Sequence, residues 1–182
     1  MKSIFNIHYS FILFVLLLLF SGYINYVCIF FYILFVHEIG HIFFIKIFHY
    51  KIKRISLFPL GGNIETNIGI LIPSRQLFLI SIAGILFQSF LFFLIPESSS
   101  VNYQVFKMLN LSLILYNSIP IYPADGYKIL LSLFENIFSY KTTILLMNTI
   151  SFLALFLFFY YTKSVLLFVF LYMMNVRAVF YF

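Results

Sequence analysis

The stretch VHEIGH, residues 36–41, decides how the rest of this sequence is understood. It places His37 and His41 four positions apart inside a long apolar run, so that on a helix both imidazoles lie on one face. Two neutral imidazoles at that spacing can hold a zinc ion, and the adjacent carboxylate of Glu38 can take a proton from water. Histidines and a carboxylate are costly in hydrocarbon and by default mark function, so we predict a metal centre here.

The composition is that of a polytopic membrane protein. Of the 182 residues, 64% are hydrophobic and 9% are charged, whereas soluble domains average about 25% charged residues. We assign the formal charge of +6 to cytoplasmic loops rather than to nucleic-acid binding, because Lys and Arg gather in such loops. The single cysteine, Cys28, permits no internal disulfide, and a thiolate metal site would need more cysteines.

The apolar runs predict an all-α polytopic fold with six transmembrane helices and a short β-hairpin between the second and the third. The spans are expected at residues 6–20, 23–48, 73–95, 103–118, 142–161 and 164–180. The polar loop at 50–72 alternates apolar and polar residues around Ile55 and Leu57 and then turns at a Pro-Leu-Gly-Gly segment, which favours a hairpin over a plain basic loop. We expect residues 1–182 to form one domain.

The distribution of basic residues predicts the orientation in the bilayer. With six spans and a cytoplasmic N-terminus, Lys107 and Lys163 lie outside, which leaves nine of the 11 Lys and Arg residues inside. The opposite orientation would violate the positive-inside rule. The end of the second span that carries His41 is therefore expected to face the cytoplasm.

A catalytic zinc usually has three protein ligands and one open position, so a third ligand is needed. The candidates are His8, His49, Glu65, Glu97, Asp125 and Glu135. Asp125 follows a segment broken by Pro120 and Pro123, and broken backbone at membrane depth is tolerated only against protein or a water-filled cavity. Span counting places this break on the same side as His41, which favours Asp125 as the ligand. The alternative role for Asp125 is a helix N-cap ahead of Gly126.

Asn117 and the glycine pair of the loop each have two interpretations. Asn117 either hydrogen-bonds backbone groups freed by the prolines or donates to a substrate carbonyl, and the sequence does not separate the two. Gly61 and Gly62 either form a simple turn or belong to a hairpin that pairs with an extended substrate as an added strand.

These motifs carry a resemblance to a known family. HEIGH in an apolar span, followed by Asn117-x-x-Pro120 and Pro123-x-Asp125-Gly126, resembles the site-2 protease family (peptidase M50) of intramembrane zinc metalloproteases. The six-span layout and the Pro-Leu-Gly-Gly segment at 59–62 resemble the stage IV sporulation protein FB branch.

The resemblance implies one Zn²⁺ per chain, held by His37, His41 and Asp125, with Glu38 as the catalytic base. It also implies a membrane-tethered protein substrate, which in the sporulation branch is a pro-sigma factor, and regulatory membrane proteins that restrain the protease. The location implied is the bacterial cell membrane, with the active site toward the cytoplasm. The residues expected to bind substrate are Asn117, Pro120, Gly61 and Gly62.

The end of the sequence departs from that branch. Its members commonly carry a C-terminal CBS domain that senses nucleotide, whereas this sequence stops at Phe182 directly after its last predicted span. A minimal or a truncated form without that domain is therefore expected.

Two rival classes of function remain open on the sequence, one non-enzymatic and one enzymatic. A metal transporter should carry more ionisable groups along its spans than Glu38 and Asp125, and a scaffold with an inactive site is the other non-enzymatic alternative. The enzymatic rival is another membrane HExxH peptidase, of the prenyl-protein-processing kind. Resemblance to that kind implies a glutamate as the third zinc ligand, and Glu135 is the candidate here.

Overall fold

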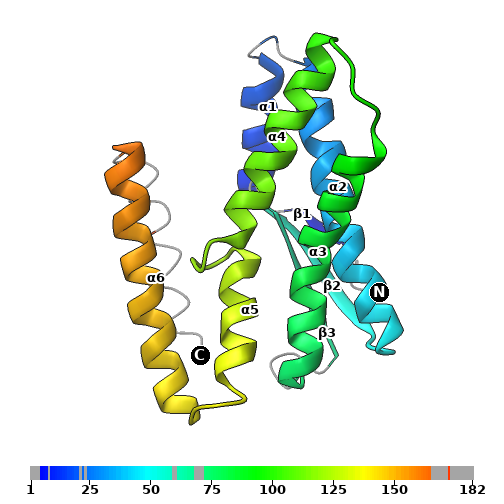
Figure 1. Cartoon of the computed structure of the whole chain (residues 1–182). Coiled ribbons are helices and arrows are strands. Elements are labelled where there is room, and N and C mark those ends of the chain that lie inside the picture. The colour runs from blue at the N-terminus through cyan, green and yellow to red at the C-terminus, as the bar shows by residue number, and fades with distance from the viewer. Residues whose placement is uncertain are drawn as a thin grey trace. The chain divides into compact units, whose positions relative to one another are not determined.

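The computed structural model describes residues 5–7, 9–20, 22, 24–58, 61–67, 72–164 and 172. Its elements are, in chain order, β1 (Phe5–Ile7), α1 (Tyr9–Phe20), α2 (Ile24–Ile47), β2 (Ile52–Phe58), β3 (Gly61–Thr66), α3 (Ser74–Leu94), α4 (Val101–Ser118), α5 (Asp125–Phe134) and α6 (Tyr140–Thr162) (Figure 1). They form two compact units. The first unit is Met1–Ile72 with Ala83–Leu113, and the second is Pro73–Ile82 with Ile114–Phe182.

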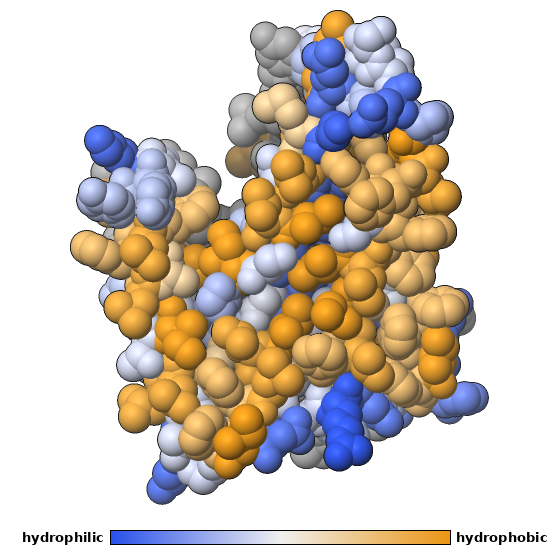
Figure 2. Space-filling view, viewed as in Figure 1, coloured by the Kyte–Doolittle hydropathy of each residue, from blue (hydrophilic) through white to orange (hydrophobic). Residues whose placement is uncertain are grey.

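Three helices within the described residues are long and apolar enough to cross a membrane, namely α2, α3 and α6. They contain 24, 21 and 23 residues, and at about 1.5 Å per residue each spans the roughly 30 Å hydrocarbon core. Hydrophobic side chains cover the flanks of the helices, and hydrophilic side chains gather where helices end (Figure 2). This distribution is that of an integral membrane protein.

The prediction of six spans is not confirmed. The run at 6–20 contains a strand and then a helix α1 of 12 residues, which is only about 18 Å long and too short to cross a bilayer. Helix α4 has 18 residues, but it is not apolar enough to count as a membrane span. Its sequence, VNYQVFKMLNLSLILYNS, carries several amide side chains. The span expected at 164–180 lies almost entirely outside the described residues.

The hairpin is confirmed, and it belongs to a larger sheet. Strands β2 and β3 pair antiparallel, with Ile55 opposite Ile64 and Ser56 opposite Asn63. Strand β1 adds to β2 in parallel, which gives the order β1-β2-β3. Sequence reasoning missed β1, because three residues are too few for periodicity to distinguish a strand from the start of a helix. The order leaves β3 at an edge of the sheet.

The first unit is organised around a close approach of α2 to α3. A buried cluster of Ile33, Leu91, Phe106 and Leu113 joins α2, α3 and α4. Gly40 permits the approach, because a Cβ there would lie 2.6 Å from the carbonyl oxygen of Ala83. Small residues let membrane helices pack with their backbones in near contact. This packing brings α3 directly against the HExxH segment.

The second unit pairs α5 with α6. Tyr127 and Leu131 of α5 pack with Met147 of α6 in a buried cluster. The broken segment after α4 is tied to α6, because the hydroxyl of Ser151 donates to the carbonyl oxygen of Pro120 at 2.8 Å. The break is therefore held by protein, as backbone outside a helix must be at membrane depth.

Candidate metal centre

The two histidines of the HExxH motif face each other on α2. His37 is 4% exposed and His41 is 8% exposed, and their Nε2 atoms lie 3.0 Å apart. Two nitrogen ligands at about 2.0–2.1 Å from a tetrahedral zinc are separated by about 3.3 Å, so this pair fits a shared zinc ion with a small adjustment. One turn of helix thus places two ring nitrogens close to the separation that the metal needs, and the hydrogen bond between them would give way to the metal.

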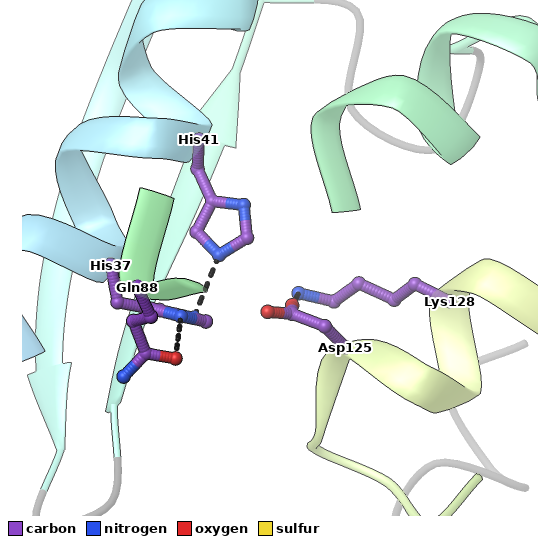
Figure 3. A network of polar contacts seen from close by, with 5 residues as sticks. All are labelled: His37, His41, Gln88, Asp125 and Lys128. Carbon is purple, nitrogen blue, oxygen red and sulfur yellow. Dashed lines mark hydrogen bonds and ion pairs between the residues drawn. The ribbon is translucent and has the colours of Figure 1, made fainter. Parts of the chain in front are cut away.

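A glutamine from α3 contacts the far side of the first imidazole. Nδ1 of His37 lies 3.0 Å from Oε1 of Gln88, and both groups are buried (Figure 3). An amide oxygen can only accept, so this contact is a hydrogen bond in the tautomer that carries its proton on Nδ1 of His37. The Nε2 atom of His37 then keeps its lone pair, which is the form of imidazole that binds a metal.

The backbone of α3 lies against both rings at Gly84. A Cβ at this position would lie 2.5 Å from Cε1 of His37 and 2.7 Å from Nε2 of His41. Distances that short are not found for real Cβ atoms, so even an alanine would displace the imidazoles. Gly84 is therefore part of the centre, through the side chain that it lacks.

A Gly84→Ala variant is expected to bind zinc at least about 10- to 100-fold more weakly than the wild type. That range is the usual cost of losing a residue that positions a metal ligand. The new methyl group would displace the two imidazole rings, so that their Nε2 atoms could no longer both reach one zinc ion. Competition with a chromogenic chelator measures the affinity. Ser81→Ala is the matched control, because its buried hydroxyl on the same helix has no hydrogen-bond partner in the described structure. Equal zinc affinity of the Gly84→Ala variant and the control would contradict the placement of the rings.

The acidic residues of the motif and of the proline segment occupy different environments. Glu38 is half-buried on α2 beside His37. Asp125 is 4% exposed and is the first residue of α5. The interpretation of Asp125 as an N-cap is wrong, because Ala124 occupies that position and no side chain caps the helix. A carboxylate in the first helical turn is stabilised by the helix dipole.

Lys128 forms an ion pair with the aspartate. Its Nζ lies 3.6 Å from Oδ1 of Asp125, one helical turn away (Figure 3). Gly126 allows α5 to begin at this point, because a Cβ there would lie 2.5 Å from the carbonyl oxygens of Ser118 and Ile119. The carboxylate is therefore held at the start of a helix that packs on the broken segment.

The residues predicted to bind substrate have defined places in the fold. Asn117 is 6% exposed near the end of α4. Pro120 lies in the break and accepts the Ser151 hydrogen bond through its carbonyl oxygen. Gly61 and Gly62 open β3 opposite Phe58 and Leu57, and the turn residues 59–60 lie outside the described residues.

Burial separates the metal-ligand candidates within the described part of the chain. His37, His41 and Asp125 are buried and each offers one ligand atom. The other histidine and acidic side chains that the structure describes are exposed or half-buried, and His8 lies outside the described residues. Glu135 is the C-cap residue of α5 and accepts a hydrogen bond of 3.2 Å from the hydroxyl of Ser74. That contact gives Glu135 a structural role at the end of its helix.

Two comparisons with known proteins agree with these features, and no protein-family model matches the chain. Over 109 residues, which are 57% of this chain, it is 35% identical to stage IV sporulation protein FB of Bacillus subtilis (strain 168). The match covers 38% of that protein, so the chain spans well under half the length of this curated relative. The solved site-2 protease from Methanocaldococcus jannaschii aligns with a TM-score of 0.68 at 24% identity, over 95% of this chain and 89% of that one.

The chain is therefore similar in sequence to part of stage IV sporulation protein FB, and similar in fold to a solved site-2 protease. The resemblance predicted from the HExxH and proline motifs is thereby confirmed.

Sequence reasoning missed two contacts around the histidines of this chain. Neither Gly84 nor Gln88 was singled out from the sequence as a site residue, whereas both lie against the imidazoles. The signal available in the sequence was an amide four residues after a glycine in a long apolar run, since polar groups in such helices are costly. That signal indicates a role but does not identify the partner.

Proposed function

We propose that this protein is an intramembrane zinc metalloprotease that cleaves a membrane-tethered protein. His37, His41 and Asp125 would hold one Zn²⁺ and Glu38 would act as the catalytic base. The observation that carries the proposal is the pair of buried Nε2 atoms 3.0 Å apart on an apolar helix long enough to cross a membrane. The burial of Asp125 supports its choice as the third ligand.

The chemistry follows from the groups on the chain. When bound, zinc acts as a Lewis acid that polarises the scissile carbonyl and acidifies water. Glu38 takes a proton from the attacking water as the water oxygen bonds to the carbonyl carbon. The C–N bond then breaks, and Glu38 returns the proton to the departing amine. One water is consumed and a carboxyl and an amino terminus are formed.

The substrate proposed is an extended segment that adds to the sheet. A helical peptide keeps its carbonyls in internal hydrogen bonds, so a membrane-tethered substrate must unwind locally before cleavage. Strand β3 lies at the edge of the sheet, where backbone groups can pair with an added strand. Asn117 and Pro120 are proposed to contact the same segment, and a pro-sigma factor or another transcription-factor precursor is the proposed class of substrate.

Replacing Gly61 and Gly62 by valine is expected to slow cleavage by about 5- to 30-fold, which corresponds to losing one or two net backbone hydrogen bonds. The branched side chains would obstruct the approach of a strand beside the start of β3. Zinc content should stay at the wild-type level, because neither residue is a metal ligand. A parallel loss of zinc and cleavage would instead indicate misfolding, and unchanged cleavage would refute strand addition.

The orientation proposed has the N-terminus and the metal centre toward the cytoplasm. In a Cys28→Ser background, a Lys107→Cys variant should react with a membrane-impermeant maleimide in intact cells. A Lys51→Cys variant should react only after permeabilisation. Both side chains are accessible to reagent, because the Lys107 side chain is 44% exposed and Lys51 is also exposed. The reverse labelling pattern would place the centre on the outer side.

The direct test of the proposed function is co-expression of the chain, residues 1–182 acting as one protease domain, with a membrane-tethered pro-sigma precursor. Cells without a site-2 protease of their own provide the background, and the shortened product is detected by immunoblotting. Regulatory membrane proteins would lower the yield of product when added. A zinc-loaded chain that cleaves no tethered precursor would overturn the assignment and favour an inactive homologue.

A further inference from the structure

The imidazole of His37 has a partner on its non-ligating side that the proposed chemistry does not use. Nδ1 of His37 lies 3.0 Å from Oε1 of Gln88, and Gln88 is fully buried at 0% exposure. The contact joins two helices across 51 positions of sequence. Burying an amide in an apolar helix costs free energy unless it forms hydrogen bonds, so the placement of Gln88 calls for a reason.

A second buried amide holds Gln88 in place. Nδ2 of Asn110, on α4, donates to the backbone carbonyl oxygen of Gln88 at 3.1 Å, and Asn110 is also 0% exposed. The bond fixes α3 against α4 at the level of the His37 contact. The result is a connected series from α4 through α3 to α2 that ends on the histidine (Figure 3 shows its last two members).

Metal binding requires a particular tautomer of His37. For Nε2 of His37 to offer a lone pair, the ring proton must reside on Nδ1, and a buried Nδ1–H needs an acceptor. The side-chain oxygen of Gln88 is the acceptor that the structure places there. Metal-binding histidines almost always have such an outer partner, which sets the tautomer and the ring orientation.

We propose that Gln88 is a positioning residue, which accepts the Nδ1–H of His37 and thereby keeps Nε2 of that ring deprotonated and directed at the metal. This inference rests on the proposed zinc site. It assigns Gln88 no contact with substrate or with the reacting atoms. Asn110 supports the arrangement by holding the backbone of Gln88.

Three variants separate hydrogen bonding from packing. Gln88→Glu keeps an acceptor oxygen at the same reach, whereas Gln88→Met keeps the length and bulk of the side chain without that acceptor. Ser89→Ala is the matched control, because it removes a neighbouring hydroxyl whose 2.8 Å bond goes to the carbonyl oxygen of Ile85 within the same helix. Full chains purified in detergent are first compared for monodispersity and helix content.

Zinc affinity is the first measurement. Gln88→Met is expected to bind zinc about 10- to 100-fold more weakly, the usual cost of losing an outer-shell partner. Gln88→Glu should bind close to the wild-type affinity, and so should Ser89→Ala. A purely structural role predicts the reverse order, because methionine suits an apolar interior better than a buried carboxylate.

The second measurement reads the tautomer without zinc or activity. The sequence contains four histidines, so nitrogen NMR of histidine-labelled apoprotein gives few signals, and a His37→Gln variant assigns the one of interest. We expect the Nδ1–H tautomer of His37 in the wild type and in Gln88→Glu. A shift toward the Nε2–H tautomer is expected in Gln88→Met.

The outcomes distinguish the inference from the function on which it rests. A Gln88→Met variant with wild-type zinc affinity and an unchanged tautomer would overturn the role of Gln88, while a wild type that binds zinc and cleaves would still support the protease. A wild type that binds no zinc would remove the proposed function. In that case the tautomer measurement would still decide whether Gln88 controls His37.

Discussion

A Glu38→Gln variant is expected to keep its zinc and to lose cleavage by about 100- to 10,000-fold, the range that general acid–base groups contribute. Glutamine has nearly the same shape as glutamate, but its amide cannot take a proton from water. Glu38 lies beside His37 on α2 without being one of the proposed ligands, so the metal should remain. Cleavage rates on a purified tethered substrate, with zinc measured by mass spectrometry, give the two quantities.

The same chemical change at another glutamate provides the control. Glu97 forms an exposed ion pair with Lys107, with the carboxylate side chain 86% exposed, and exposed pairs contribute little to stability. Glu97→Gln should therefore leave both cleavage and zinc unchanged. Normal cleavage by Glu38→Gln would show that the proposed base is another group, and loss of zinc would show that Glu38 helps to hold the metal.

An Asp125→Asn variant is expected to lower zinc affinity strongly, because a direct metal ligand is removed. The loss should exceed the about 10- to 100-fold that follows when a residue supporting a ligand is lost. An uncharged amide oxygen is a much poorer zinc ligand than a carboxylate. The side chain of Lys128 is 38% exposed and can be hydrated once its partner is neutral. The fold of the second unit should therefore persist, which a comparison of thermal unfolding would check.

Glu135→Gln discriminates between the two proposed architectures. A glutamine can still accept the hydrogen bond from Ser74, so this variant should fold and bind zinc normally if Asp125 is the third ligand. The opposite result, with zinc lost in Glu135→Gln and kept in Asp125→Asn, would indicate the prenyl-protein-processing type of site. Zinc lost in both variants would point to a defect of the second unit as a whole.

The local pattern of apolar and polar residues was sufficient to predict much of the fold. The predicted spans at 23–48, 73–95 and 142–161 correspond to α2, α3 and α6, because a long apolar run has one stable form in hydrocarbon. The alternation of residues after the second span identified the hairpin. The run at 6–20 was assigned as a span because hydropathy alone does not show where a helix starts, and part of it pairs with β2 instead.

The candidate site was likewise predictable from the sequence only in part. The four-residue spacing predicted two imidazoles on one helical face, and their Nε2 atoms are observed 3.0 Å apart. The convergence of Asp125 on that pair stays a prediction from the motifs and the family resemblance. The contact between Gln88 and His37 was not predicted, because it joins residues 51 positions apart on different helices.

The sequence by itself determined a membrane-embedded chain with an HExxH pair on an apolar helix, because hydropathy and helical periodicity depend only on neighbouring residues. Only the tertiary structure decided that β1 completes the sheet, that Gly84 leaves space for two imidazoles, and that Gln88 is hydrogen-bonded to one of them. These features depend on which faces of distant segments meet, and that choice is made by close packing of the whole unit rather than by any one stretch of residues.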